Sequence, residues 1–361
     1  MFFYFLITII SALMMYYIQH QKKRIWNSEA GIYQLKKKAK ILYALPFIPL
    51  LAISALRYGI GTDYFWTYYP TFFRIKYGYE LGWSLEPGFL VLNKIVASFS
   101  NDVTWVIAFC AILFFAFVGK AILEQSENPT LSILLLVGTG LFQFSLNGMR
   151  QAIAIAVWMY AIKYIKEQRF WPYFFWLLFA SLFHFSGLLL VPFYFLYRLE
   201  LDPPKATVLI VGTAVFTNTL KRIILYVASF TKYYDKFVGT SQLEGDFAYS
   251  TFFVLLAMFV YLVILYKPLK NIWEYDFLLM ATTLGVVCAI LTKDIYVIAR
   301  VLCFFQYMPT LYFPLTLKKF KSRERFLIGF LTVFFYFLYI WFMADYLGKG
   351  DSVPYQSIFS R

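Results

Sequence analysis

The chain has 361 residues, of which 61% are hydrophobic and 22% aromatic, and only 14% are charged. A soluble domain has about 25% charged residues, so this composition excludes a water-soluble globular protein and predicts an all-α polytopic membrane protein. The formal net charge of +14 at pH 7 does not indicate a nucleic-acid partner, because the basic runs lie between apolar spans, as cytoplasmic loops do.

The apolar runs predict about 12 membrane crossings, oriented by the lysines and arginines between them. The first run is followed by Lys22, Lys23 and Arg24, which is the reverse of a cleavable signal peptide. We therefore expect the amino terminus outside, and the alternation places the carboxyl terminus outside too. The expected spans are the run before Lys22, then 41–56, 103–123, 131–145, 152–165, two short spans within 169–200, 206–220, 250–266, 277–291, 301–317 and 326–344.

Two long segments lie between the spans, at residues 57–102 and 221–249. The first is rich in glycine and aromatic residues, and its apolar stretch 88–99 is short for a crossing, which needs about 20 residues. We expect an external loop with re-entrant or interfacial helices there, and a second external loop with a short helix at 221–249. The whole chain, 1–361, is predicted to form a single transmembrane domain.

Four ionisable side chains occur where an apolar span ends or begins on the expected outer face: Arg57, Arg150, His184 and Arg300. Ionisable groups cost about 2.5–3.5 kcal/mol at membrane depth, so they usually mark a pathway or a site. A cationic cluster predicts an anionic ligand, and the planar donor fork of arginine suits phosphate.

Arg57 begins the run Arg-Tyr-Gly-Ile-Gly-Thr-Asp-Tyr. Its glycines, Gly59 and Gly61, permit tight turns and a close approach of the backbone to a ligand. Asp63, which precedes Tyr64, is a candidate to orient Arg57 or to act on a substrate hydroxyl. An interfacial Arg–Asp pair that only fixes the loop explains the same residues equally well.

Two further candidates stand at predicted helix starts. Arg150 and Gln151 follow Asn147-Gly148, and a helix N-terminus has unpaired N–H groups and a positive dipole end that together bind anions. Glu86 precedes Pro87-Gly88, where a negative charge favours the helix. The alternatives are an arginine that extends to lipid headgroups and a plain helix-start charge.

His184 lies in an apolar run, whereas the other histidine, His20, lies at the cytoplasmic end of the first span. It is a candidate general base or a hydrogen-bond donor to phosphate, and a buried structural histidine is the alternative. Ser186-Gly187 predict a helix break beside it. Arg300 opens the eleventh span, with the same two interpretations as Arg150. No catalytic triad, Walker loop or metal-ligand cluster is visible, so no cofactor or metal is expected.

Five short motifs occur together in one order. The chain resembles the EpsG-like, Wzy-type polysaccharide polymerases of bacteria over nearly its whole length, from Arg57 to Val353-Pro-Tyr355. The motifs that carry the resemblance are Arg57-Tyr-Gly-Ile-Gly-Thr-Asp-Tyr64, Glu86-Pro-Gly-Phe89, Arg150-Gln-Ala-Ile-Ala154, Phe183-His-Phe-Ser186 and Ile298-Ala-Arg300.

The resemblance implies a metal-independent glycosyltransferase in the bacterial cytoplasmic membrane, similar in architecture to the GT-C transferases. It would make an exopolysaccharide, capsule or O-antigen from a glycan donor on undecaprenyl pyrophosphate and a lipid-linked acceptor repeat. A chain-length regulator and a flippase are further candidate partners, beside membrane lipid. The implied roles are pyrophosphate binding by Arg57, Arg150 and Arg300, acceptor binding or deprotonation by His184, with Asp63 or Glu86 as alternatives, and support from Gln151, Gly59, Gly61 and Tyr64.

A transporter such as a flippase for lipid-linked oligosaccharide is the alternative function. It too needs outer cations and a groove for a lipid tail. However, a transporter usually carries charges along a path to the other side, and such charges are sparse here. A purely structural scaffold explains the lysines but not the placement of the arginines and the histidine.

Overall fold

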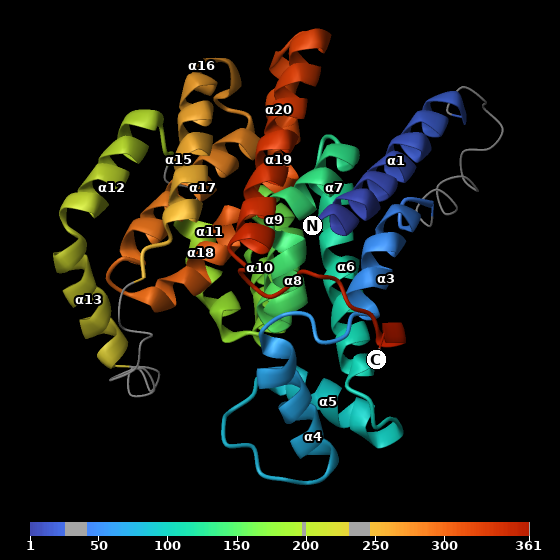
Figure 1. The fold of residues 1–361 in the computed structure, drawn as a ribbon. Helices are drawn as coiled ribbons and strands as arrows, with labels where there is room; N and C mark the ends of the chain where they lie inside the picture. Colours follow the sequence, from blue (N-terminus) through green and yellow to red (C-terminus); the bar gives the residue numbers. More distant parts are fainter. Residues whose placement is uncertain (26–41, 197–199, 231–245, 361) are drawn as a thin grey trace. The chain divides into compact units, whose positions relative to one another are not determined.

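Figure 1 shows the chain as a computed structural model that describes residues 1–25, 42–196, 200–230 and 246–360. Within these ranges the chain is helical or irregular, apart from one isolated antiparallel bridge between Arg57 and Ser357. The predicted all-α class is thereby confirmed. Residues 26–41, which include most of the basic cytoplasmic loop expected up to Lys40, and residues 231–245 of the second external loop lie outside the described residues.

The described chain forms two compact units. Unit 1 comprises Met1–Val191 and Phe320–Arg361, and unit 2 comprises Pro192–Lys319. Each unit is described by itself, and the single transmembrane domain stays a prediction.

Unit 1 is built around α9, a helix that is buried on every side from Gln151 to Ile162. A helix that is apolar all round must be covered by neighbours, and α9 packs against α6 and α10. Trp158 Nε1 donates to Tyr173 OH at 3.1 Å, and that hydroxyl donates to the Leu190 carbonyl at 2.7 Å. The elements of unit 1 are α1 (Phe2–Ile25), η1 (Leu45–Phe47), α3 (Ile48–Ala55), η2 (Tyr64–Tyr68), α4 (Tyr69–Lys76), α5 (Pro87–Phe99), α6 (Thr104–Gln125), α7 (Pro129–Gly138), α8 (Leu141–Asn147), α9 (Met149–Lys166), α10 (Phe170–Ser181), η3 (Phe185–Leu190), α20 (Ser322–Trp341), η7 (Phe342–Tyr346) and η8 (Ile358–Ser360).

Unit 2 is centred on α17, which packs against α12, α15, α18 and α19. Asp202 caps the first of these helices by accepting from the Lys205 N–H at 2.9 Å, and Pro203 occupies the first helical position, where its missing N–H costs nothing. The elements of unit 2 are α11 (Phe193–Leu196), α12 (Pro203–Val215), α13 (Thr217–Ser229), α15 (Tyr249–Ile264), α16 (Tyr266–Leu269), α17 (Trp273–Leu291), η5 (Tyr296–Ile298), α18 (Ala299–Gln306), α19 (Pro309–Thr316) and η6 (Leu317–Lys319).

Four of the described helices have the length and hydropathy of a membrane crossing, namely α1, α6, α17 and α20 with its continuation η7. The number rises to six if the bent pairs α7–α8 and α12–α13 each form one span. The chain is therefore a multi-pass membrane protein. The count of 12 crossings is not reached by these helices, and it stays a prediction together with the likeness to GT-C transferases.

The expected crossing at 206–220 differs from the structure. Its first part is α12, but the helix bends by 84° before α13 begins at Thr217. The 57–102 segment agrees better with expectation, because it contains the short helices η2, α4 and α5. In Figure 1 α4 and α5 lie together beyond the end of α6.

Candidate functional site

Arg150 lies in the first turn of α9, as the sequence predicts, and Glu86 is the residue before α5. Arg150 Nη1 donates to Glu86 Oε2 at 2.5 Å, and the two side chains are 23% and 10% exposed. The guanidinium also lies over the Phe89 ring, 5.4 Å from its centroid. The structure therefore holds a partly exposed cation at a helix N-terminus, an arrangement suited to an anion.

A close backbone contact joins the start of α5 to the end of α10. The Gly88 N–H donates to the Leu182 carbonyl at 2.8 Å, and a Cβ at Gly88 would lie 2.8 Å from the same oxygen. Glycine is needed here because any larger residue would push the helices apart. Glu86 is two residues from Gly88, and His184 is two residues from Leu182. The contact thus brings Glu86 and His184 to one junction.

His184 occupies the break between α10 and η3, so the break predicted at this point is confirmed. Its Nδ1 accepts from the Ser186 N–H at 3.4 Å and lies 2.6 Å from Ser186 Oγ. Because a backbone N–H can only donate, the neutral ring carries its proton on Nε2. The geometry therefore favours His184 as a hydrogen-bond donor through Nε2 and not as a general base.

Asn147 and Tyr68 connect the outer loop to this junction, and the sequence did not identify either as a site residue. Asn147 Oδ1 accepts from the Asp63 N–H at 2.9 Å and from Thr62 Oγ1 at 3.0 Å. Tyr68 OH donates to the Asn147 carbonyl at 2.5 Å and accepts from the Met149 N–H at 2.9 Å. These bonds satisfy backbone groups left open between α8 and α9. The sequence offered one indication of a role for Asn147, which is its position beside a glycine at a predicted helix start.

Gly61 lies where the loop crosses the end of α8. It has φ +91°, and a Cβ would stand 2.8 Å from the Leu146 carbonyl oxygen. The expected close approach at Gly61 is thus to the chain's own backbone.

Replacing Gly61 by alanine should destabilise the protein by about 1–3 kcal/mol, because the substitution adds a strained φ and a steric clash. Thermal unfolding of the purified protein in detergent measures this. Gly82→Ala is the matched control, since a Cβ at Gly82 meets nothing within 4 Å. Equal melting temperatures for the two variants would contradict the prediction.

Asp63 does not pair with Arg57, so the expectation that it orients this arginine is wrong. The turn through the two glycines carries Asp63 to α8, whereas the guanidinium turns back toward α3. Thr67 Oγ1 donates a long hydrogen bond of 3.5 Å to the carboxylate, and Tyr68 OH, whose proton points to the Asn147 carbonyl, lies 3.5 Å from it. Asp63 lies outside the helices that could span the membrane. Burial raises the pKa of its carboxyl above the ordinary value, and the charge of Arg150 opposes this rise in part.

Arg57 is 1% exposed. Its Nη1 donates to the Ser54 carbonyl at 2.6 Å, while Nε and Nη2 have no hydrogen-bond partner in the described part of the chain. No carboxylate of the described residues is among its electrostatic neighbours. The positive charges of both Arg57 and Arg150 act on the phenol of Tyr68. A buried cation without an anion is costly, which makes Arg57 the most unusual residue of unit 1.

The carboxyl-terminal tail, residues 351–358, runs beside Arg57. The Tyr58 N–H donates to the Gln356 carbonyl at 3.0 Å, and the Ile358 N–H donates to the Leu56 carbonyl at 2.9 Å. Tyr4 OH, near the start of α1, donates to the Ser352 carbonyl at 2.7 Å. The start of α1 and the tail therefore lie at the same end of unit 1 as Arg57.

The remaining sequence candidates take different positions. Gln151 is buried in α9 next to Arg150, and Tyr64 is 1% exposed at the start of η2. Gly59 has φ +64°, which suits the turn expected there. Arg300 lies in the first turn of α18, in unit 2. Its position relative to the two arginines of unit 1 stays a prediction.

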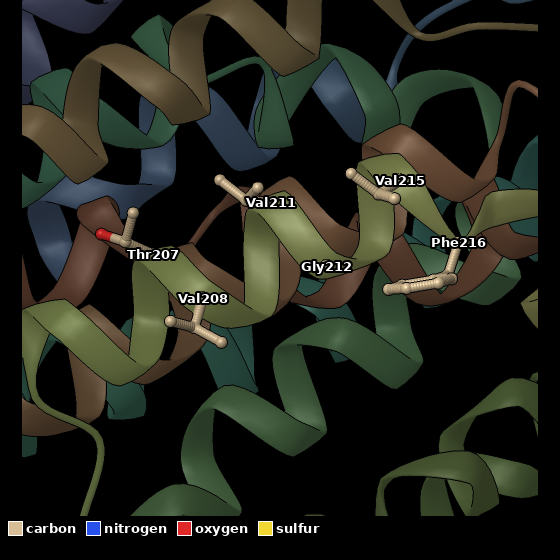
Figure 2. A pocket seen from close by; sticks show the side chains of 6 residues that line it. All are labelled: Thr207, Val208, Val211, Gly212, Val215 and Phe216. Carbon is tan, nitrogen blue, oxygen red and sulfur yellow. The ribbon is translucent and has the colours of Figure 1, made fainter.

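Figure 2 shows an apolar hollow on α12, at the bend toward α13. It offers no charged group to an anion and contains none of the candidate residues. Among the residues that the structure describes, no three His, Cys, Asp or Glu side chains come together as a metal ion would need. The side chains around the hollow are Thr207, Val208, Val211, Val215 and Phe216, with Gly212 between them.

Comparison with known proteins gives one match. The model of the EpsG family matches residues 40–357 of this chain. No curated protein and no solved structure matches this chain. The matched range includes every candidate residue described above.

Proposed function

The chain belongs to the EpsG family, which suggests a Wzy-type polymerase of polysaccharide biosynthesis, and from that premise we propose the reaction. In this reaction the protein joins lipid-linked oligosaccharide repeats at the outer face of the bacterial cytoplasmic membrane. The donor is a glycan on undecaprenyl pyrophosphate, and the acceptor is one lipid-linked repeat. The reaction class is glycosyl transfer without a metal or cofactor.

The single observation that supports this proposal is the position of Arg150. It stands at the N-terminus of α9, is oriented by Glu86, and keeps part of its guanidinium exposed. A departing pyrophosphate develops negative charge on its bridging oxygen, and positioned N–H donors stabilise such charge without rearranging during the reaction. Arg57 adds a second, buried positive charge whose field reaches the Tyr68 phenol, and Arg300 stays a candidate for the same role.

In the proposed step, an acceptor hydroxyl attacks the anomeric carbon of the donor. The new glycosidic C–O bond forms as the bond from that carbon to the pyrophosphate oxygen breaks. Asp63 takes the hydroxyl proton, since its raised pKa makes it a better base than an ordinary aspartate. Glu86 is less suited because its carboxylate already accepts from Arg150. His184 donates from Nε2 to the acceptor or to a phosphate oxygen.

The proposed topology follows from the position of the two chain termini, which lie at the same end of unit 1 as Arg57. The tail and the start of α1 lie beside Arg57, so an outer site places both termini outside, with about 12 crossings in all. Grooves between spans would hold the polyprenyl chains of donor and acceptor. A chain-length regulator and a flippase are proposed partners in the membrane.

Activity should fall on the acid side with an apparent pKa above about 3.9, the ordinary value for aspartate. The sign follows from the base role, because Asp63 must be ionised to take a proton and burial raises its pKa. The measurement is kcat/KM as a function of pH between pH 4 and pH 8. Asp63→Asn should lower activity strongly and remove the acid-side fall of kcat/KM, which is the acidic limb of the profile. Glu86→Gln should keep this limb. An unchanged limb in Asp63→Asn would contradict the assignment.

A reconstitution assay tests the proposed function. The purified protein, inserted in vesicles, is incubated with lipid-linked repeats and no other protein, and the products are separated by size. We expect a ladder of longer glycans. Translocation of unchanged repeats, with no ladder, would indicate the flippase alternative and overturn the proposal.

A further inference from the structure

The helix that follows Asp63 has aromatic rings on two faces. η2 and α4 continue one another from Tyr64 to Lys76. On one face, Tyr64, Tyr68 and Phe72 are only 1–3% exposed and pack into unit 1. The rings of the other face are not needed for this packing.

The second face carries an aromatic stripe, which we define as Phe65, Tyr69, Phe73 and Tyr77. The four residues are spaced by four along the helix and are 43–57% exposed. Neighbouring ring centroids lie 6.4, 6.4 and 4.6 Å apart along the stripe. At 1.5 Å per residue the stripe is about 18 Å long. It forms a continuous row of half-exposed rings, and Tyr79 stacks against Phe73 beside it.

The stripe differs in composition from another exposed row of rings in the same unit. On α20, a helix long and apolar enough to cross a membrane, Phe326, Phe330 and Phe334 form an exposed stack of phenylalanines alone. The aromatic stripe instead alternates phenylalanine with tyrosine, while both helices carry basic residues, Arg74 and Lys76 near the end of α4 and Arg323 and Arg325 at the start of α20. The tyrosines place hydroxyl groups beside apolar rings, so the stripe suits a ligand with both apolar and hydroxyl surfaces.

The stripe also begins at the candidate site. Phe65 is two residues after Asp63, whose own backbone N–H donates to Asn147 Oδ1 at 2.9 Å. A chain that lies along the stripe would therefore reach the carboxylate proposed to act on the acceptor. This continuity connects the row of rings with the site of bond formation.

We propose that the aromatic stripe binds the glycan chain by stacking successive sugar rings, which holds the polymer next to the site. The C–H face of a sugar packs on the negative face of an aromatic ring, and tyrosine hydroxyls bond to sugar hydroxyls. This inference rests on the proposed function and names the part of its substrate that the stripe contacts. Stacking tolerates different sugars, so the stripe sets chain length more than sugar identity.

The test compares the double variant Tyr69→Ala/Phe73→Ala with Trp66→Ala. Trp66 is on the same helix and 84% exposed, but it lies outside the stripe. The probes are lipid-free oligosaccharides, released by mild acid from the polysaccharide of the source strain and separated into single repeats and longer chains. Their affinities are measured by calorimetry on the protein in lipid nanodiscs, with melting temperatures as a check on folding.

We expect the double variant to bind the longer chains about tenfold more weakly, as the loss of two ring contacts predicts, and to produce shorter polymers. Trp66→Ala should stay within about twofold of the wild type. Equal binding by the double variant, or an equal loss in Trp66→Ala, would overturn the inference. So would quenching of a Tyr69→Trp variant by brominated lipid, which would place the stripe in the bilayer.

The two proposals fail separately. If the wild type elongates lipid-linked repeats but the stripe variant binds glycan as tightly as the wild type, only this inference is overturned. If the wild type forms no ladder while oligosaccharide binding depends on the stripe, only the polymerase function is overturned.

Discussion

Arg150→Ala should lower kcat for polymer formation by a factor of about 10²–10³, the usual effect of removing one donor to developing negative charge. Arg150 is partly exposed, but the substitution leaves the buried Glu86 carboxylate without this partner, so thermal unfolding of the variant is measured beside its activity. The measurement is the initial rate of ladder formation, with KM for the lipid-linked donor determined in parallel.

The matched control is Arg169→Ala, which breaks an arginine–glutamate pair of 3.1 Å at an exposed position of the same unit. It should leave both constants within about twofold. If Arg150→Ala raised KM with kcat unchanged, Arg150 would bind donor and transition state equally. If it only reduced the yield of folded protein, the arginine would be structural.

Arg57→Met should abolish long polymers and yet leave the melting temperature unchanged or higher. Replacement of buried charge by an apolar side chain of similar volume is often neutral or stabilising, by up to about 4 kcal/mol. Arg57 has two N–H groups without a partner in the described chain and no nearby carboxylate to lose. A buried charge of this kind adds little to stability, which points to a function in the reaction.

Arg57→Lys is the control for charge. It keeps the positive charge near Tyr68 but loses the Nη1 bond to the Ser54 carbonyl, so we expect partial activity. The readouts are product length and thermal unfolding of the same preparations. A large drop in melting temperature for Arg57→Met, together with full activity in the folded fraction, would show that Arg57 only supports the loop.

The local features of the site could be predicted from the sequence because short-range rules fix them. Pro87 and Gly148 mark the starts of α5 and α9, and this places Glu86 and Arg150 at helix N-termini, as observed. Ser186-Gly187 likewise marks the break beside His184. Each of these depends on residues within one helical turn.

Long-range partners could not be predicted. Glu86 pairs with Arg150, 64 residues away in the chain, and no local pattern relates the two. The sequence suggested Asp63 as a partner of Arg57 because they are six positions apart, but the positive φ of Gly61 turns the chain away. The sequence also did not predict that Asn147 and Tyr68 belong to the site, because only the fold brings them together.

The number of crossings is harder to predict than the existence of the helices. The expected spans coincide with helical residues of the described chain, but many of these helices are shorter than 18 residues or are bent. Gly140, with φ +88°, separates α7 from α8 at a 52° bend. Hydropathy measures apolar length, and it is insensitive to a turn of this kind.

The most direct test of the proposed chemistry is the stoichiometry of the reconstituted reaction. Polyprenyl pyrophosphate released from labelled donor is counted against glycosidic bonds formed, with chelator present. Transfer from a pyrophosphate donor predicts one lipid pyrophosphate released for each bond, and both products lost together in Arg150→Ala. Bonds formed without release of the lipid pyrophosphate, or release without new bonds, would contradict it.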